Sequence, residues 1–289
     1  MRIPDRIVTA LADRRIAVLD VIRGAKRAIS LSLFRCTDDE IFAELANATA
    51  RGVAVDALVT ARAKGGRKKL EKLCRALDQA HVVVRQYNDP VVKYHAKYLV
   101  ADDGPAVVAS LNFTKKCFTR TMDALVITHD PAVTTGLRRL LQADRDSEPL
   151  PGDLTDRLII GPERARRQLT GLIEQAQRRI RLIDAKLSDP DLVSLLRARR
   201  DAGVAVEVFN AKRLGELKSH GKMLLVDGRL GVVGSLALAA LSLDFRREVA
   251  MMVDEPSAVA DLEQLFDSVA ALTPDGSPNV NAQKGATWC

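Results

Sequence analysis

Aromatic residues are scarce in this chain of 289 residues: one Trp, three Tyr and seven Phe make up 4% of it. Proteins that bind single-stranded nucleic acid usually stack bases on aromatic side chains, so this shortage argues against that role. Long apolar runs are missing too, although a helix that crosses a bilayer needs about 20 predominantly apolar residues. The composition, with 47% hydrophobic and 28% charged residues, excludes a membrane bundle and a disordered chain and is typical of a globular protein.

Cysteine is rare and has no pattern. The cysteines form no Cys-x-x-Cys pair, and no histidine lies at metal-ligand spacing beside them. We therefore expect free thiols in a reducing compartment, without a disulfide frame or a zinc site. Residues 1–18 mix charges throughout and lack the apolar stretch of a signal peptide, so we expect a soluble, cytoplasmic protein. The four cysteines are Cys36, Cys74, Cys117 and Cys289.

Negative charge is in the minority. Lys and Arg number 44 against 37 Asp and Glu, which gives a formal net charge of +7. A positive surplus favours anionic partners, either nucleic acid or an acidic lipid surface, and does not choose between them. The length suits one large domain or two small ones.

The chain repeats itself. Residues 95–102 read HAKYLVAD and residues 220–227 read HGKMLLVD, so both segments are His-x-Lys followed by four residues and Asp. The offset between them, 125 residues from His95 to His220, persists downstream without a gap. It relates Ser110 to Ser235, Asp123 to Glu248 and Pro131 to Pro256.

Upstream, the repeat continues at a different offset. Residues 20–34 align with 171–185, and residues 37–59 align with 188–210, both at an offset of 151. The first copy therefore holds 26 extra residues, which fall within 60–93 and include the basic helix candidate ARAKGGRKKLEKLCRAL. We expect this segment to shape one wall of a cleft. Its cations either grip phosphates or form a solvated helix face.

Two copies of one unit predict the domain organisation. We place the first half at residues 1–148 and the second at 149–272, with a polar, Pro-rich linker over residues 144–153 and a disordered tail over 273–289. Alternating helices and strands predict an α/β sandwich, and two like units in one chain should pack about a pseudo-twofold axis as a monomer. The second copy predicts helices at 163–179, 189–202 and 256–271 and strands at 181–187, 204–210, 221–226, 230–235 and 248–253.

The repeated motif predicts a catalytic cleft. In an extended segment His95 and Lys97 project from the same face, as do His220 and Lys222. A pseudo-twofold axis near that face would gather both pairs into one anion site. One imidazole could attack phosphorus while the other protonates the leaving alkoxide.

Further residues complete the predicted site. Lys97 and Lys222, the amide of Asn112 and the hydroxyls of Ser110 and Ser235 are the expected phosphate ligands. Carboxylates recur 28 residues after each histidine, and we expect each to orient the histidine of its own copy: Asp123 for His95 and Glu248 for His220. No cluster of metal ligands is evident, so we expect a reaction without metal or cofactor.

These motifs resemble the phospholipase D superfamily, whose signature stands here as HAKYLVAD…ASLN and HGKMLLVD…GSLA. The resemblance covers the chain except the tail and implies tandem α/β/α sandwich halves, a phosphohistidine intermediate and no metal. It implies that His95 is the nucleophile, that His220 is the acid, and that Asp102 and Asp227 are structural. The second copy departs from the signature, because Ala237 stands where the first copy has Asn112.

Three functions are compatible with this pattern. The first is a phospholipase D-type phosphodiesterase that hydrolyses or exchanges phospholipid headgroups, with contact to an anionic membrane face left open. Cations at 112–120 and an apolar then basic segment at 236–247 suit a lipid, although residues 236–243 would equally suit the core. The second is a nuclease with the same chemistry, which the basic charge suits equally well. The third is a weakened phosphodiester-binding module, which only Ala237 suggests.

Overall fold

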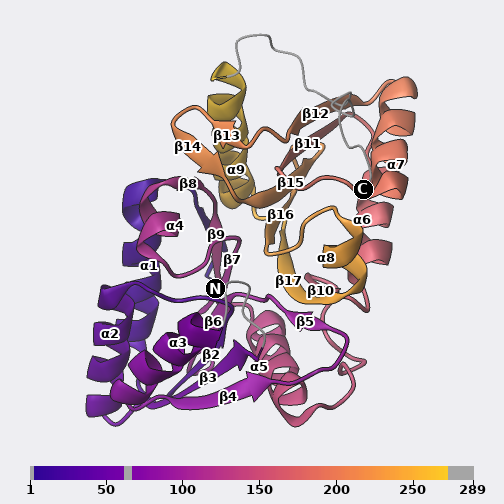
Figure 1. The fold of residues 1–289 in the computed structure, drawn as a ribbon. Helices are drawn as coiled ribbons and strands as arrows, with labels where there is room; N and C mark the ends of the chain where they lie inside the picture. The colour runs from indigo at the N-terminus through magenta and orange to yellow at the C-terminus, as the bar shows by residue number, and fades with distance from the viewer. Residues whose placement is uncertain (1–2, 62–66, 273–289) are drawn as a thin grey trace.

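The computed structural model describes residues 3–61 and 67–272. Two mixed sheets form the frame, one in each half of the chain (Figure 1). Together with the helices that cover them, they confirm the predicted α/β sandwich of two pseudo-symmetric halves. The predicted tail at 273–289 lies outside the described residues. Among those residues, no helix combines the length and apolar character that crossing a bilayer requires.

The first sheet has seven strands in the order β1-β9-β7-β6-β2-β3-β4. Its central strands β2 and β3 are parallel, whereas β6 and β7 are antiparallel to their neighbours. The strands are β1 (Arg6–Val8), β2 (Ala28–Leu33), β3 (Ala54–Thr60), β4 (Val83–Tyr87), β6 (Tyr98–Ala101), β7 (Ala106–Ala109) and β9 (Leu125–Thr128). The helices of this half are α1 (Leu11–Gly24), α2 (Asp39–Ala50), α3 (Arg67–Gln79), α4 (Lys115–Thr119) and α5 (Pro131–Asp146).

The second sheet follows the order β10-β17-β16-β15-β11-β12 and gains β5 of the first half beside β17. Its strands are β10 (Leu158–Gly161), β11 (Arg179–Asp184), β12 (Ala205–Phe209), β15 (Lys222–Val226), β16 (Leu230–Gly234) and β17 (Arg246–Val253), with β5 at Lys93–Tyr94. The helices are α6 (Ala165–Glu174), α7 (Pro190–Asp201), α8 (Ala240–Asp244) and α9 (Pro256–Ala271). A small sheet joins β13 (Arg213–Leu214), β14 (Leu217–Ser219) and β8 (Thr121–Met122).

The predicted elements of the second half are present within a few residues. The largest difference is at the helix predicted over 163–179, because α6 ends at Glu174 and the chain then turns into β11. Strand β10 was not predicted, since its four residues leave little room for a pattern. The basic helix candidate of the first half is present as α3.

Apolar side chains divide into three cores. One lies between the first sheet and helices α1 to α3, and another between the second sheet and helices α6 to α8. The third joins the facing surfaces of both sheets with α5 and α9, and it includes Tyr98, Val108, Met223 and Val249. Because both halves contribute to this central core, their division at residues 148 and 149 stays a prediction.

The predicted linker is wrong at its start. Asp144 belongs to the last turn of α5, is 4% exposed, and accepts a hydrogen bond of 2.7 Å from Nε of Arg247. The guanidinium of Arg247 also binds both carboxylate oxygens of Glu163 and the carbonyl oxygen of Gly161. A buried charge needs such partners, and this network fixes the start of β17 against α5 and β10.

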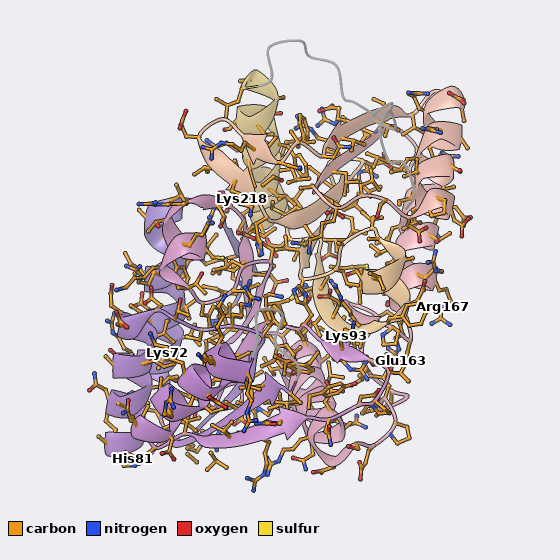
Figure 2. The ribbon with its side chains drawn as sticks, in the orientation of Figure 1. Lys72, His81, Lys93, Glu163, Arg167 and Lys218 are labelled. Atoms are coloured by element: carbon orange, nitrogen blue, oxygen red, sulfur yellow. The ribbon has the colours of Figure 1, made fainter. Side chains whose placement is uncertain are left out.

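Two short strands cross from one half to the other. Strand β5 pairs in parallel with the start of β17, and β14 pairs in parallel with β8 (Figure 1). Lys93 and Lys218, both labelled in Figure 2, lie on these two crossing strands. Each crossing strand leads directly into a His-x-Lys motif, so both motifs begin on backbone that is hydrogen-bonded to the opposite half.

Close packing of β16 against β17 provides a stability test. A Cβ added at Gly234 would lie 2.3 Å from Cα of Ala250 and 2.4 Å from the carbonyl oxygen of Val249. Backbone atoms cannot yield as side chains do, so we expect Gly234→Ala to lower the free energy of unfolding by about 3 kcal/mol or more. Gly171 is the matched control, because a Cβ there meets nothing within 4 Å. Gly171→Ala in α6 should stabilise by about 0.5–1 kcal/mol, and urea denaturation measures both; equal effects would contradict the close packing.

Candidate active site

The two His-x-Lys motifs lie at the seam between the sheets. Residues 95–97 connect β5 to β6, while Lys222 opens β15 after His220 and Gly221. Nζ of Lys97 lies 3.1 Å from Nδ1 and 3.3 Å from Nε2 of His95, so the two side chains share one face. Lys97 and Lys222 also donate to the carbonyl oxygens of His95 and His220, respectively. The same local geometry is therefore built twice.

The carboxylates cross between the halves. Nδ1 of His95 lies 2.8 Å from Oε2 of Glu248, and Nδ1 of His220 lies 3.0 Å from Oδ1 of Asp123. The prediction that each carboxylate orients the histidine of its own half is wrong. The two carboxylates are the predicted residues, but each contacts the histidine of the opposite half.

The crossing strands explain this exchange. The N–H group of His95 donates to the carbonyl oxygen of Arg247, the residue before Glu248, over 2.9 Å. In the other half, the N–H group of Gly221 donates to the carbonyl oxygen of Met122, the residue before Asp123, over 2.7 Å. Adding a strand to a partner's edge fixes register through main-chain hydrogen bonds. That register places each histidine beside the opposite carboxylate.

Buried hydroxyls hold the carboxylates. Ser110 and Thr121 each donate to Asp123 over 2.6 Å, and Ser242 donates to Glu248 over 2.9 Å. Ser110 and Ser235 had been predicted as phosphate ligands, but they are 0% and 1% exposed. The hydroxyl of Ser235 exchanges hydrogen bonds with the backbone of Val249 and interacts with Glu248. Both serines thus act on the carboxylates, and their hydroxyls are turned away from solvent.

Asn112 and its counterpart in the second half, Ala237, have different surroundings, as the difference in sequence predicts. Asn112 is 7% exposed, and its Oδ1 has no hydrogen-bond partner in the part of the chain that the structure describes. The N–H group of Ala237 donates instead to the hydroxyl of Ser242, which in turn binds Glu248. The second half therefore uses a backbone group and a serine to support the carboxylate, and Ala237 stands in place of an amide side chain.

The two motif aspartates directly follow strands β6 and β15. Asp102 accepts hydrogen bonds from three successive backbone N–H groups at residues 26–28, and Asp227 does the same at 177–179. Both have left-handed backbone, with φ of 46° and 55°. Each carboxylate fastens the start of β2 or β11, and the N–H groups hold its pKa below the usual range.

Burial lowers the pKa values of both imidazoles. It is the largest influence on His95 and, with the charge of Lys97, lowers the pKa of that histidine to about 3 against the opposing effect of Glu248. The pKa of His220 is also lowered, mainly by burial and despite Asp123. Burial alone would raise the pKa values of Asp123 and Glu248, but their histidines and the nearby lysines hold both below the usual range. The site therefore pairs ionised carboxylates with a neutral imidazole at His95.

Additional cations surround the motifs. The pKa of Lys97 is lowered to about 7, first by its complete burial and then by the charges of Lys222 and Lys186. Nη1 of Arg246 lies 4.0 Å from Oε1 of Glu248, and the charge of Arg246 also acts on the exposed side chain of Lys186. Sequence reasoning missed Lys186 and Arg246. The repeat held a signal for one of them, because the offset of 151 places Lys186 opposite Arg35, another cation.

One aromatic ring contributes to the site and was also missed. The ring of Phe34 lies 4.4 Å from the ring of His95, and Nζ of Lys97 lies 5.2 Å from its centroid. The repeat places Ala185 at this position in the second half. The surroundings of the two histidines are therefore unequal, with an apolar wall on the His95 side.

A group of possible metal ligands overlaps this site. Ligand atoms of Cys117, Asp123 and His220 lie within 4.8 Å of one another. Both oxygens of Asp123 already accept hydrogen bonds, and the charges of Arg14 and Lys222 act on Asp123 from nearby. Neighbouring positive charges oppose a bound cation. The group fits an orienting carboxylate better than a metal centre.

Comparisons with known proteins bear on the family and the fold. A family model described as "Cardiolipin synthase, PLD-like domain" matches residues 18–145. The polyphosphate kinases of Mycolicibacterium paratuberculosis and Mycobacterium avium are each 26% identical over 306 residues, which cover 90% of this chain and 41% of the relative. The chain thus spans about two-fifths of the length of the curated relatives it matches.

Two solved structures share the fold. Polyphosphate kinase from Porphyromonas gingivalis superposes with a TM-score of 0.72 and 17% identity, over 91% of this chain and 50% of that one. Phosphatidylserine synthase from Haemophilus influenzae superposes with a TM-score of 0.74 and 11% identity, over 93% of this chain and 87% of that one. At these identities the likeness concerns the fold.

The site and the fold together define an arrangement in which two pseudo-symmetric halves share one centre. The match of residues 18–145 to the PLD-like family model, together with the two His-x-Lys-x4-Asp motifs and the shared fold, supports the phospholipase D superfamily for this chain.

The crossed pairs provide a direct test. Because Glu248 contacts His95 and not His220, we expect Glu248→Gln to change the tautomer and pKa of His95 alone. Asp123→Asn should change those of His220 alone. Nitrogen-15 NMR of the labelled imidazoles reads both properties for each histidine. A response of His220 to Glu248→Gln, with His95 unchanged, would restore pairing within each half.

Proposed function

We propose that the chain cleaves or transfers phosphodiesters through a phosphohistidine on His95. Nε2 of His95 attacks phosphorus, the bond to the leaving oxygen breaks, and His220 gives its proton to that oxygen. In the second step, the oxygen of a water or alcohol molecule attacks phosphorus while His220 takes its proton, and the P–N bond to His95 breaks. The observation that carries this proposal is the crossed set of two histidines, each bound at Nδ1 by an ionised carboxylate, around buried lysines.

The unequal exposure of the histidines supports the assignment of roles. The side chain of His95 is 11% exposed and that of His220 is 24% exposed. A nucleophile must be neutral, which deeper burial favours, whereas an acid must exchange protons with its surroundings. Glu248 binds Nδ1 of His95 and so leaves Nε2 for the attack. Lys97 and Lys222 then meet the charge that develops on the phosphate oxygens.

For the substrate we propose a phospholipid phosphodiester. The apolar wall at Phe34 touches the nucleophile, and Leu241 and Phe245 are 61% and 47% exposed beside Arg246. Apolar groups next to a cation suit a lipid headgroup with its chains and peripheral contact with an anionic membrane face. The expectation that residues 236–243 are core is met by Leu236, Leu238 and Leu243 but not by Leu241.

A second candidate is transfer of phosphoryl groups between phosphoanhydrides. The curated relatives are polyphosphate kinases, and this chain spans two-fifths of their length. Lys186 and Arg246 add positive charge beside Lys97 and Lys222, which would suit a substrate with several neighbouring phosphates. Release of headgroup from liposomes, consumption of polyphosphate and nicking of plasmid DNA, measured side by side, distinguish lipid, phosphoanhydride and nucleic acid substrates.

The nucleophile is tested by trapping. With an activated p-nitrophenyl phosphodiester, His220→Ala should release one equivalent of p-nitrophenol and then stall, because no base remains to activate water. Mass spectrometry after the burst should find the phosphoryl group on His95. His95→Asn should give no burst and at least 1000-fold lower turnover. Phosphate found on His220 in the His95→Asn protein would reverse the two roles.

The lowered pKa values predict the pH dependence. His220 must be protonated to act as the acid, and its pKa lies below the ordinary value. Lys97, with a pKa of about 7, also loses its charge as the pH rises. Both effects have the same sign, so kcat/KM for an alkyl phosphodiester should fall from about pH 5.5 to about pH 8. A p-nitrophenyl ester needs no proton on its leaving group and should show a shallower fall. Identical profiles for the two esters would remove His220 from the role of acid.

A further inference from the structure

A groove opens between helices α2 and α3, next to the site. Its cavity volume is about 670 Å³, within the range of roughly 300–1,000 Å³ that is usual for small-molecule pockets. Apolar side chains from both helices and from the turn after α3 line most of it. They include Phe42, Ala46, Leu70, Leu73, Ala76 and Ala80.

The groove adjoins the candidate site at Phe34. Phe34 lines the groove, and the same ring lies 4.4 Å from the imidazole of His95. Phe34 follows directly on β2, and α2 begins five residues later. One side chain thus forms a wall of both spaces, and a ligand with its phosphate at His95 could extend past Phe34 into the groove.

Charge is distributed unevenly around the groove. Arg35, Lys69 and Lys72 line its rim (Lys72 is labelled in Figure 2), whereas Asp39 there forms an ion pair with Lys115. The cationic side chains of the rim therefore favour an anionic group, and the floor of the groove below them is apolar. The buried lining residues are Cys36, Leu73 and Ala80.

We propose that this groove binds an acyl chain of a phospholipid whose phosphodiester lies at His95, an inference that rests on the proposed function. The buried floor offers neither amide nor hydroxyl side chains with which to read the edge of a nucleobase, because the polar lining residues Thr37 and Gln79 are exposed. An aliphatic chain needs no such partner and gains by leaving water, by about 0.8 kcal/mol for each buried CH₂ group.

The groove is specific to the first half. Helix α3 lies within the extra segment that interrupts the repeat, and between β12 and β15 the second half has the hairpin β13–β14 in its place. Ala185 stands at the position of Phe34. The insertion thus places an apolar pocket next to His95, on the side to which the nucleophile is assigned.

The test separates binding from turnover. We would use His95→Asn as the background and a pyrene-acyl lysophosphatidylglycerol as the fluorescent probe. Ala46→Trp fills the groove from α2 and should raise the dissociation constant of the probe at least tenfold. Ala50→Trp is the matched control, because Ala50 is exposed on the same helix outside the groove, and should leave it unchanged. Ala43→Trp, at an exposed position of the lining, serves if Ala46→Trp fails to fold.

Turnover provides the second readout. With His95 intact, Ala46→Trp should lower at least tenfold the ratio of kcat/KM for the palmitoyl lysolipid to that for glycerophosphoglycerol. If neither groove variant changes probe affinity or this ratio, the proposal is overturned. Displacement of the probe by ATP but not by unlabelled lysolipid would also overturn it, in favour of a nucleotide. If the groove variants weaken probe binding while wild type cleaves no phosphodiester, the groove stands and the proposed function fails.

Discussion

The architecture depends on two short strands that leave one half and pair with the other. Strand β5 extends the second sheet beside β17, and β14 pairs with β8 of the first half. These contacts fix the register at which each histidine meets a carboxylate. The core between the two sheets and the buried Arg247 network keep the halves in that register. The candidate active site is thus formed at the interface, and neither half contains it alone.

Much of this could be predicted from the sequence. The two motifs and their common offset predicted a duplicated α/β unit and the gathering of His95, Lys97, His220 and Lys222, because side chains two residues apart in extended chain share a face. The partner of each histidine could not be predicted. Pairing within a half and pairing across the halves satisfy the same spacing of 28 residues and the same twofold symmetry. The decision lies in strands of two or three residues, which are too short to carry a hydrophobic period.

Other differences have equally local causes. Ser110 and Ser235 occupy the expected positions in the repeat, but their hydroxyls bind carboxylate or backbone because they are fully buried and those are the groups within reach. Lys186 and Arg246 reach the centre from the ends of separate strands, and their arrangement emerges only when the sheets pack. The basic helix in the extra segment could be predicted from the sequence. The groove between this helix and α2 could not, because its shape depends on how α3 packs against α2.

The exchange of carboxylates also constrains how such a protein could be rebuilt. A designer who transplants residues 1–148 onto another scaffold would carry over the imidazole of His95 together with Asp123, a carboxylate that serves a ring left behind. The imidazole of His95 would lose the carboxylate of Glu248 and would contact instead the residue that the new scaffold has at that place. The two functional units of this molecule are the hydrogen-bonded pairs His95–Glu248 and His220–Asp123. Each pair joins the two halves, so cutting the chain between the halves separates the members of both pairs.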